Sequence, residues 1–405
     1  MARTVLMVML DSLRHDYVRA EDAPFLHGLA AQGTHGSLAP SFGFEPDGAY
    51  FAGLSPQECD GGAQFWLRPG ERLFHLTGLF GALHRLPVPA WRRFIRKATR
   101  ASAQWLASDP LPRAMASPAF IPYDQLARFS LSLAQMPDDP RAMHGASLFD
   151  IARRRGLQTY VHCFPQFKVK TDVVRERYLR EDRGQHDFAF LFFGDLDGIG
   201  HRHGPDSPER RAMMQRVDAA LADIWRHARA RYDEVAIVVF GDHGMADVRG
   251  CVDVRGAIAA AGLDVRRDAW FIDSTFARFW VSDAARRARL RDALSQVPGG
   301  RLVTDADRDA WHIRWPHNHF GDEIFAVDDH LLMHPSFYAE DAPPLGMHGY
   351  LPGCRDNESA FVIAGDGVPH LPPRERVDMR RLFHTVAALL GEQTTPAPGL
   401  ESLMS

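Results

Sequence analysis

Cysteine, lysine and long apolar runs are all scarce in this sequence of 405 residues. The four cysteines form no close pair, so neither a disulfide framework nor a cysteine zinc site is indicated. Lysine occurs at only three positions, and 47 Lys and Arg against 51 Asp and Glu give a net charge of −4, which excludes a strong basic field for duplex nucleic acid. No apolar run reaches the roughly 18 residues of a membrane helix.

Targeting features are equally sparse. The apolar run Val5–Leu10 is too short for the core of a secretory signal and is ended by Asp11, so we expect a cytoplasmic location. The content of 45% hydrophobic and 24% charged residues is typical of a globular protein, and the length favours two or three domains or one large domain with insertions.

Short apolar runs alternate with helical patterns. The expected strands are Thr4–Leu10, Gln158–Phe164, Asp187–Phe193, Val235–Phe240 and Phe361–Ala364. The expected helices are Pro24–Gly33, Ser147–Gly156, Ser207–Arg231 and Arg376–Leu390. Because the strands lack polar alternation, both of their faces are expected to be buried. This predicts an α/β fold, a doubly wound and mostly parallel sheet covered by helices.

Two segments interrupt this alternation. We expect a core of residues 1–61, 146–267 and 341–405, a lid-like insertion of residues 62–145, and a second insertion or cap of residues 268–340. The second insertion contains β-like runs at Phe271–Val281 and Glu323–Val327. Insertions in α/β folds usually lie over the carboxyl ends of the strands. The basic and apolar stretch 85–105 could contact anionic lipid, but we expect a lid or a docked helix instead.

Acidic and histidine residues cluster after three expected strands and before a fourth. They are Asp11, Asp197, His201, Asp242, His243 and His348. Because the carboxyl ends of parallel strands meet at one edge of a sheet, these side chains could converge. Carboxylates with imidazoles suit divalent metals, Zn²⁺ first. Six such groups exceed the needs of one ion and suit two ions about 4 Å apart, an arrangement that serves phosphoryl displacement.

The same residues lie in three longer motifs. These are Asp197-x-x-Gly200-His201-x-x-Gly204-Pro205, Asp242-His243-Gly244-Met245 and His348-Gly349-Tyr350. In this order they resemble the type I phosphodiesterase/nucleotide pyrophosphatase branch of the alkaline phosphatase superfamily, over residues 4–60, 146–265 and 345–390. The resemblance implies an alkaline-phosphatase-like fold and hydrolysis of a small-molecule phosphate ester.

The resemblance also implies a distribution of ligands between two divalent ions. Asp197, His201 and His348 would hold one ion. The other would be held by Asp11, Asp242, His243 and a nucleophile oxygen from Thr or Ser, on which a covalent phospho-enzyme forms.

The nucleophile is where this sequence departs from the family. In the family the nucleophile normally lies about ten residues before a Thr-Gly or similar dipeptide. The corresponding glycine here is Gly53, and ten residues before it lies Gly43, which has no hydroxyl. Ser41 is the nearest hydroxyl upstream and the first candidate. Glu45 and Asp47 are rivals, since either could bind metal or act as a general base while water attacks phosphorus.

We therefore predict a phosphodiesterase or nucleotide pyrophosphatase. The alternatives are phosphomonoester, sulfate or phosphonate hydrolysis, phosphotransfer on the same scaffold, or a metal-binding pseudoenzyme.

Overall fold

A computed structural model describes residues 2–44, 46–59, 61–67, 94, 125, 128–131, 136–143, 145–163, 167–315, 318, 320–339 and 342–405. Glu45 and, apart from Phe94, the stretch 85–105 lie outside the described residues. The chain divides into two compact units. Unit 1 comprises Met1–Cys59, Met136–Asp247 and Leu345–Ser405, and unit 2 comprises Asp60–Gln135 and Val248–Pro344. The expected domain limits stay a prediction.

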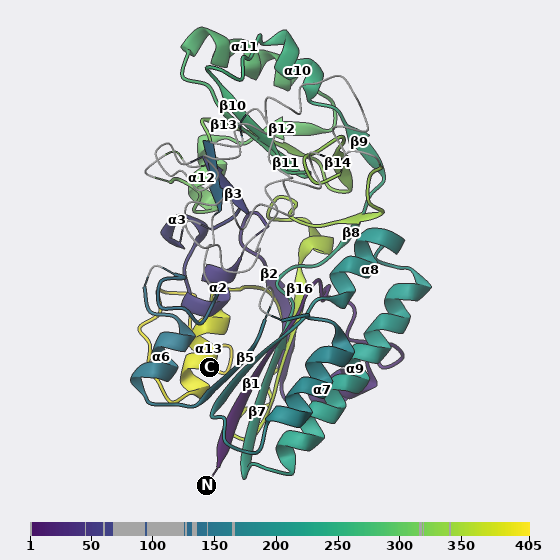
Figure 1. Cartoon of the computed structure of the whole chain (residues 1–405), viewed down its shortest axis with the longest axis vertical. Helices are drawn as coiled ribbons and strands as arrows, with labels where there is room; N and C mark the ends of the chain where they lie inside the picture. The colour runs from purple at the N-terminus through teal and green to yellow at the C-terminus, as the bar shows by residue number, and fades with distance from the viewer. Residues whose placement is uncertain are drawn as a thin grey trace. The chain divides into compact units, whose positions relative to one another are not determined.

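Unit 1 is built around a seven-stranded sheet (Figure 1). The strands, in order across the sheet, are β17 (Arg374–Asp378), β2 (Thr34–Ala39), β16 (Ser359–Gly365), β7 (Glu234–Phe240), β1 (Arg3–Leu10), β6 (Phe188–Phe193) and β5 (Thr159–His162). Strands β7, β1, β6 and β5 are mutually parallel, while β16 runs antiparallel to both of its neighbours. The carboxyl ends of the parallel strands therefore share one edge with the start of β16 and the end of β2.

Alternate residues of β1 face two separate hydrophobic cores. Leu6 and Val8 belong to the core under α1 (Pro24–Ala30), α7 (Thr171–Glu181), α8 (Asp195–His203) and α9 (Pro208–Arg229). Val5 and Met7 belong to the core under α2 (Asp47–Ala52), α6 (Leu148–Arg154) and α13 (Arg381–Leu389). Figure 1 shows these two helical layers on opposite faces of the sheet. Burial on both faces explains the continuous apolar runs of the central strands.

The expected elements differ from the observed ones mainly at the edge of the sheet. Helix α1 ends at Ala30, and the following residues from Thr34 form β2, which the sequence analysis did not predict. The expected helix Arg376–Leu390 is wrong in its first residues, because Arg374–Asp378 forms β17, and α13 begins only at Arg381. Strand β17 has a solvent-facing side rich in charge, a pattern that resembles a helical surface in the sequence but suits an edge strand.

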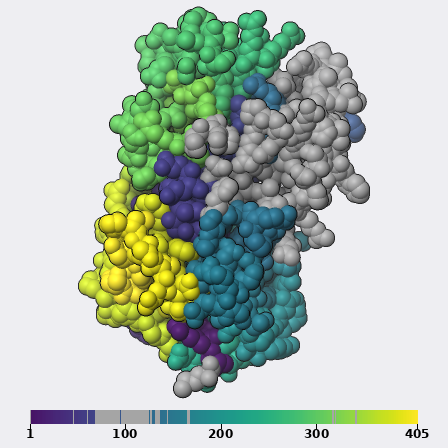
Figure 2. All heavy atoms as spheres, turned by 90° about the vertical axis from the view of Figure 1, so that its left-hand side faces the viewer, coloured from purple at the N-terminus to yellow at the C-terminus, as the bar shows by residue number. Residues whose placement is uncertain are grey.

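On the surface of unit 1 the end of the chain lies next to α6. Arg154 of α6 pairs with Glu392 at 3.0 Å, and Figure 2 shows the yellow C-terminal residues beside the blue segment that contains α6. Among the residues that the structure describes, none of the helices is both long and apolar enough to cross a bilayer.

Unit 2 contains a four-stranded antiparallel sheet in the order β10 (Ala269–Ile272), β11 (Phe276–Trp280), β13 (Glu323–Val327) and β12 (Gly300–Leu302). The run Phe271–Val281, which reads as one β segment in the sequence, is a hairpin. At its turn Asp273 accepts two hydrogen bonds from the fully buried Arg278 of β11. The other elements of unit 2 are α10 (Arg255–Ala260), α11 (Ala284–Ser295), α12 (Asp305–Ala310), β9 (Gly250–Val252), β14 (Leu331–Met333), β3 (Phe65–Leu67) and β4 (Phe129–Leu131).

Candidate active site

Two neighbouring parallel strands bring the first acidic residues together. Asp11 follows β1 directly, and Asp242 lies two residues after β7, with Met9 of β1 paired to Phe240 of β7. His243 follows Asp242 and is 6% exposed. Its Nε2 lies 3.4 Å from Asp11 Oδ1 and 3.4 Å from Asp242 Oδ2. The strand register thus gathers Asp11, Asp242 and His243 at one edge of the sheet.

Asp197 and His201 come from a helix instead of a loop. Both lie on α8, which begins directly after β6, and their spacing of four residues places them on the same helical face. The distance from His201 Nε2 to Asp197 Oδ1 is 3.0 Å. The α-helix therefore presents a carboxylate and an imidazole side by side.

A short strand pair carries His348 to the same edge. Strand β15 (Gly346–Met347) pairs with β8 (Ala246–Asp247), which follows the His243 loop, so Met347 lies opposite Ala246. The imidazoles of His348 and His243 stack with ring centroids 3.6 Å apart and an interplanar angle of 4°. His348 Nε2 lies 3.6 Å from Asp197 Oδ1. The structure thus brings together all six residues singled out in the sequence.

Two groups of potential ligand atoms share one histidine. Asp11, Asp242 and His243 form one group, and Asp197, His243 and His348 form the other, with all ligand atoms in each group within 4.8 Å of one another. The first group matches the set expected for one ion. The second contains His243 and two of the three residues expected for the other ion, Asp197 and His348. The third expected residue, His201, is not in this group, but its Nε2 lies close to Asp197 Oδ1. The roles of these residues as ligands stay a prediction.

The hydrogen bonds of the imidazoles favour a cation between these groups. His201 Nδ1 lies 2.8 Å from the Gly346 carbonyl and His243 Nδ1 lies 2.8 Å from the Gly244 carbonyl, so in each ring Nδ1 carries the proton. In the neutral rings Nε2 then carries a lone pair, and this lone pair faces carboxylate oxygens. Acceptors facing acceptors at 3.0 to 3.4 Å require a cation or an additional proton between them. The residues present therefore fit divalent metal ions.

Burial without a metal ion opposes the charged state of several of these groups. Desolvation lowers the pKa of His348 well below its usual value, helped by the neighbouring His243. Burial raises the pKa of Asp242, and the charge of Asp197 raises it further. For Asp197 burial acts in the same upward direction, but the imidazole of His201 outweighs it and holds the pKa below the usual range. Carboxylates and imidazoles held this closely depend on a positive charge, as metal ions would supply.

The candidate nucleophile segment lies beside this site. The ring of Phe44 contacts His348 edge-on, with centroids 5.4 Å apart, which places the segment that contains Ser41 near the cluster. Asp47 begins α2 and accepts a hydrogen bond from the buried Tyr50. Burial raises the pKa of Tyr50, and the charges of both Asp47 and Asp242 contribute, so this tyrosine lies near both carboxylates. Glu45 lies outside the described residues.

Sequence reasoning missed two residues that fix the ligand-bearing loops. Ser12 has a φ of +69°, and it donates from its N–H to Asp242 Oδ1 at 3.1 Å and from its Oγ to the Gly244 carbonyl at 3.2 Å. Arg14, 5% exposed, donates to Asp16 and Asp206 and to the Met245 carbonyl. The available signal for Ser12 was its place directly after Asp11.

Comparisons with known proteins agree with this geometry. A family model described as type I phosphodiesterase/nucleotide pyrophosphatase matches residues 141–351. Human ectonucleotide pyrophosphatase/phosphodiesterase family member 7 is 33% identical over 100 residues, which is 24% of this chain and 21% of the human protein. GPI ethanolamine phosphate transferase 2 of Saccharomyces cerevisiae is 33% identical over 87 residues, 21% of this chain and 10% of the yeast protein. The matched segments thus span 21% and 10% of these two relatives.

Solved structures show the same fold over nearly the whole chain. Human ectonucleotide pyrophosphatase/phosphodiesterase 5 superposes with a TM-score of 0.69 at 16% identity, covering 98% of this chain and 97% of the human one. An inactive threonine-to-alanine variant of the murine protein, in complex with AMP, gives the same values. The expected alkaline-phosphatase-like fold is therefore confirmed. Since the family model matches half of the sequence, this chain belongs to the type I phosphodiesterase/nucleotide pyrophosphatase family.

Proposed function

We propose that this protein hydrolyses a phosphodiester or pyrophosphate bond in a small-molecule substrate with the help of two zinc ions. The observation that carries the proposal is the pair of ligand groups that share His243. Zinc is proposed because the donors are carboxylates and imidazoles, and because the tautomers of His201 and His243 leave Nε2 available. Asp11, Asp242 and His243 would hold one ion, and Asp197, His201 and His348 the other, with His243 close enough to the second group to contribute to both ions.

Each part of the chain has a distinct task in this proposal. When bound, the two ions would neutralise charge on the phosphoryl group and favour the deprotonated nucleophile. The carbonyls of Gly346 and Gly244 keep His201 and His243 in the tautomer that ligation requires. Gly43, with a φ of +102°, gives the backbone between Ser41 and Phe44 the freedom to bring its N–H toward a substrate oxygen.

Ser41 is the proposed nucleophile. It is the only Ser or Thr in residues 40–53, and the inactive threonine-to-alanine variant of the murine relative supports a hydroxyl in this role. In-line attack by Ser41 Oγ would form a serine phosphate ester as the bond to the leaving group breaks, and water would then cleave that ester. Asp47 is less suited to this task, because it already accepts a hydrogen bond from Tyr50 at the start of α2.

The proposed substrate class is supported by the relatives' names and by the site's chemistry. Nucleotide pyrophosphatases and a complex with AMP favour a nucleoside phosphate ester as substrate. A second candidate is transfer of a phosphorylated alcohol to an acceptor hydroxyl, supported by the partial match to ethanolamine phosphate transferases. Both reactions proceed through the same charged transition state, so the metal ligands do not distinguish them.

Activity assays with defined metal content test the proposal. Purified protein stripped with EDTA and reloaded with zinc is assayed on bis-p-nitrophenyl phosphate, p-nitrophenyl phosphate and p-nitrophenyl sulfate, with product analysis in the presence of ethanolamine. We expect zinc-dependent cleavage of the diester ahead of the monoester and the sulfate. Full activity after EDTA treatment would contradict the two-metal proposal, and metal binding without turnover of any ester would support the pseudoenzyme alternative.

The Ser41→Ala variant tests the nucleophile. We expect its zinc content to be unchanged and its rate to fall by about 100-fold or more, because the attacking group is lost while the ligands remain. Trapping a phosphorylated Ser41 by rapid acid quench and mass spectrometry provides direct support. Unchanged turnover in Ser41→Ala would assign the attack to water and remove the covalent step.

A further inference from the structure

One turn touches both histidine loops of the candidate site. The turn contains the 3-10 helix η4 (Arg355–Asn357), whose last residue, Asn357, is 3% exposed. Its Oδ1 accepts a hydrogen bond from the Gly349 N–H at 2.8 Å. Its backbone carbonyl accepts one from the Gly244 N–H, also at 2.8 Å. Gly349 follows His348 and Gly244 follows His243, so one residue bonds the backbone of both loops directly after their histidines.

The approach of the turn to the His243 loop leaves no room for a side chain. A Cβ on Gly244 would lie 2.2 Å from the Asp356 carbonyl oxygen and 2.5 Å from that of Glu358. On the other loop, a Cβ on Gly349 would lie 2.4 Å from the ring of Phe44, which also contacts His348. Both glycines therefore permit close contact between the histidine loops and their neighbours.

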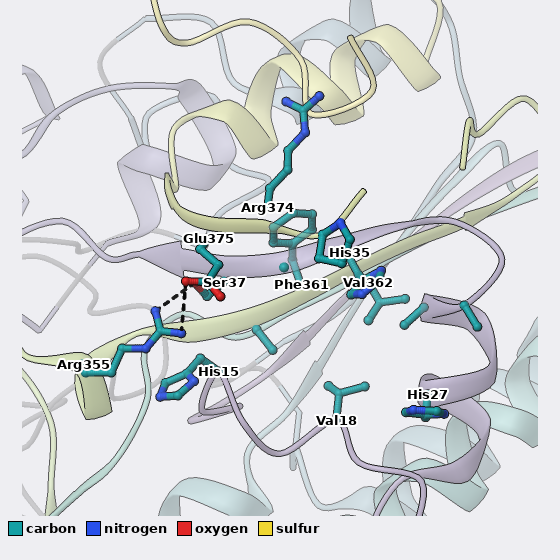
Figure 3. A pocket seen from close by; sticks show the side chains of 15 residues that line it. His15, Val18, His27, His35, Ser37, Arg355, Phe361, Val362, Arg374 and Glu375 are labelled. Atoms are coloured by element: carbon teal, nitrogen blue, oxygen red, sulfur yellow. Dashed lines mark hydrogen bonds and ion pairs between the residues drawn. The ribbon is translucent and has the colours of Figure 1, made fainter. Parts of the chain in front are cut away.

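The turn is itself held by contacts on its far side, where it borders a cavity of about 380 Å³ (Figure 3). Arg355 donates to Ser37 of β2 at 3.3 Å and to Glu358, as Figure 3 shows for Ser37. Glu358, 2% exposed, also pairs with Arg376 at 2.8 Å, and its carbonyl accepts from the His15 N–H at 3.0 Å. Because these contacts fix the turn to the sheet, Asn357 has a rigid base from which to hold the two loops.

We propose that Asn357 is a positioning residue that sets the mutual placement of the stacked imidazoles of His243 and His348. The inference rests on the proposed two-metal function and adds to it a residue outside the six predicted ligands. A metal site needs its ligand atoms within a few tenths of an ångström of their bonding positions. The two hydrogen bonds of Asn357 supply that constraint through backbone groups, without contact with a metal ion or the substrate.

Two substitutions with the same number of side-chain heavy atoms as Asn separate the hydrogen bond from packing. Asn357→Asp keeps an acceptor at Oδ1 for the Gly349 N–H, whereas Asn357→Leu removes it. Cobalt(II) and zinc affinities are measured by chelator competition, the visible spectrum of the cobalt form reports ligand geometry, and thermal unfolding of the metal-free variants reports the fold. We expect Asn357→Leu to weaken metal binding by about 10- to 100-fold and to change the cobalt spectrum, and Asn357→Asp to stay within about threefold of wild type.

The outcomes separate this inference from the function on which it rests. Wild-type metal affinity in Asn357→Leu, or equal losses in both variants, would overturn the role of Asn357 while the two-metal proposal stands on the wild-type measurements. A wild-type protein that binds no metal would instead contradict the proposed function itself. If Asn357→Leu does not fold, Asn357→Ala takes its place, since it lacks the acceptor and adds no atoms, and the same outcomes decide.

Discussion

Ser12 occupies a backbone conformation that normally selects glycine. Its φ of +69° lies in the left-handed region, which costs a residue with a Cβ about 1–2 kcal/mol. In this conformation its Oγ donates to the Gly244 carbonyl and its N–H donates to Asp242. These two bonds hold the candidate ligand Asp242 and the loop that contains His243. A glycine at this position would avoid the strain but would lack the hydroxyl. Strain of this kind is common at functional sites.

Two substitutions at Ser12 test this balance. Ser12→Ala keeps the strain and removes the Oγ hydrogen bond, so we expect a loss of about 1 kcal/mol in the free energy of unfolding. Ser12→Gly removes both, and the two effects offset each other, which leaves stability close to that of wild type. Urea unfolding of the metal-free proteins measures the difference. Equal stability of the two variants would show that the backbone at this position is not strained.

His243 is the one residue common to both ligand groups, which predicts a distinct pattern of metal loss. We expect Asp11→Asn to retain about one of two zinc ions and His243→Ala to lose most of both, with activity lower by orders of magnitude in each. His203→Ala is the matched control, because His203 lies on α8 with a side chain 41% exposed. Metal content is read by mass spectrometry of the desalted proteins. Equal zinc loss in Asp11→Asn and His243→Ala would show that His243 serves one ion only.

At the scale of elements, the capping box of α6 offers a test that is independent of the metal site. Ser147 Oγ accepts from the Asp150 N–H, and Asp150 Oδ2 accepts from the Ser147 N–H at 2.9 Å. Partial burial raises the pKa of Asp150, but hydrogen bonds from Ser147 and Arg153 outweigh it and leave the pKa below the usual value. A carboxyl with a lowered pKa stabilises the fold above its unfolded pKa and loses that contribution as the pH falls through the folded pKa.

We therefore expect Ser147→Ala to lower the free energy of unfolding by about 1 kcal/mol at pH 7 and by less at pH 3, because the contribution of the Asp150 carboxylate is lost as the pH falls through its pKa. Urea titrations of wild type and variant at both pH values, with chelator present throughout, give the comparison. A difference that is the same at pH 3 and pH 7 would mean that the carboxylate does not take part in the cap.

The elements that the sequence predicted well are those whose pattern is set by burial. Strands β1, β6 and β7 are buried on both faces and read as continuous apolar runs. Strand β2 was missed because its segment, with polar and glycine residues, carries no comparable signal. The antiparallel direction of β16 was equally hidden, since direction depends on connections between distant segments and not on local pattern.

The candidate site shows the same division. Residue types and strand ends were sufficient to single out the six side chains that converge. Their arrangement was not predictable, because it depends on α8 starting immediately after β6 and on the two-residue pairing of β15 with β8. Asn357 carries no metal-ligand chemistry, and only its bonds to two distant glycines indicate its role.

At the scale of the whole molecule, the candidate metal ligands are confined to one of two compact units. All six predicted ligands, Ser41 and Asn357 belong to unit 1, and the family match at 141–351 includes parts of both units. Unit 2 has its own antiparallel sheet and a buried ion pair between Asp273 and Arg278. Burial raises the pKa of Asp273 to about 6, although Arg278 acts against it. The folding of unit 2 therefore has its own determinants.

This division predicts where metal ions stabilise the protein. Ligands that bind only the folded state stabilise it by about 2.7 kcal/mol at a concentration 100 times their dissociation constant. We expect zinc to slow backbone hydrogen exchange in β1, β7 and α8 of unit 1, which carry or directly precede the proposed metal-binding side chains. We expect exchange in the sheet of unit 2 to stay unchanged. Mass spectrometry of the EDTA-treated and zinc-loaded protein measures this, with His243→Ala as the control that should show little response. Equal slowing in β10, β11 and β13 would show that metal binding orders both units together, and no slowing in unit 1 would argue against the ligands assigned above.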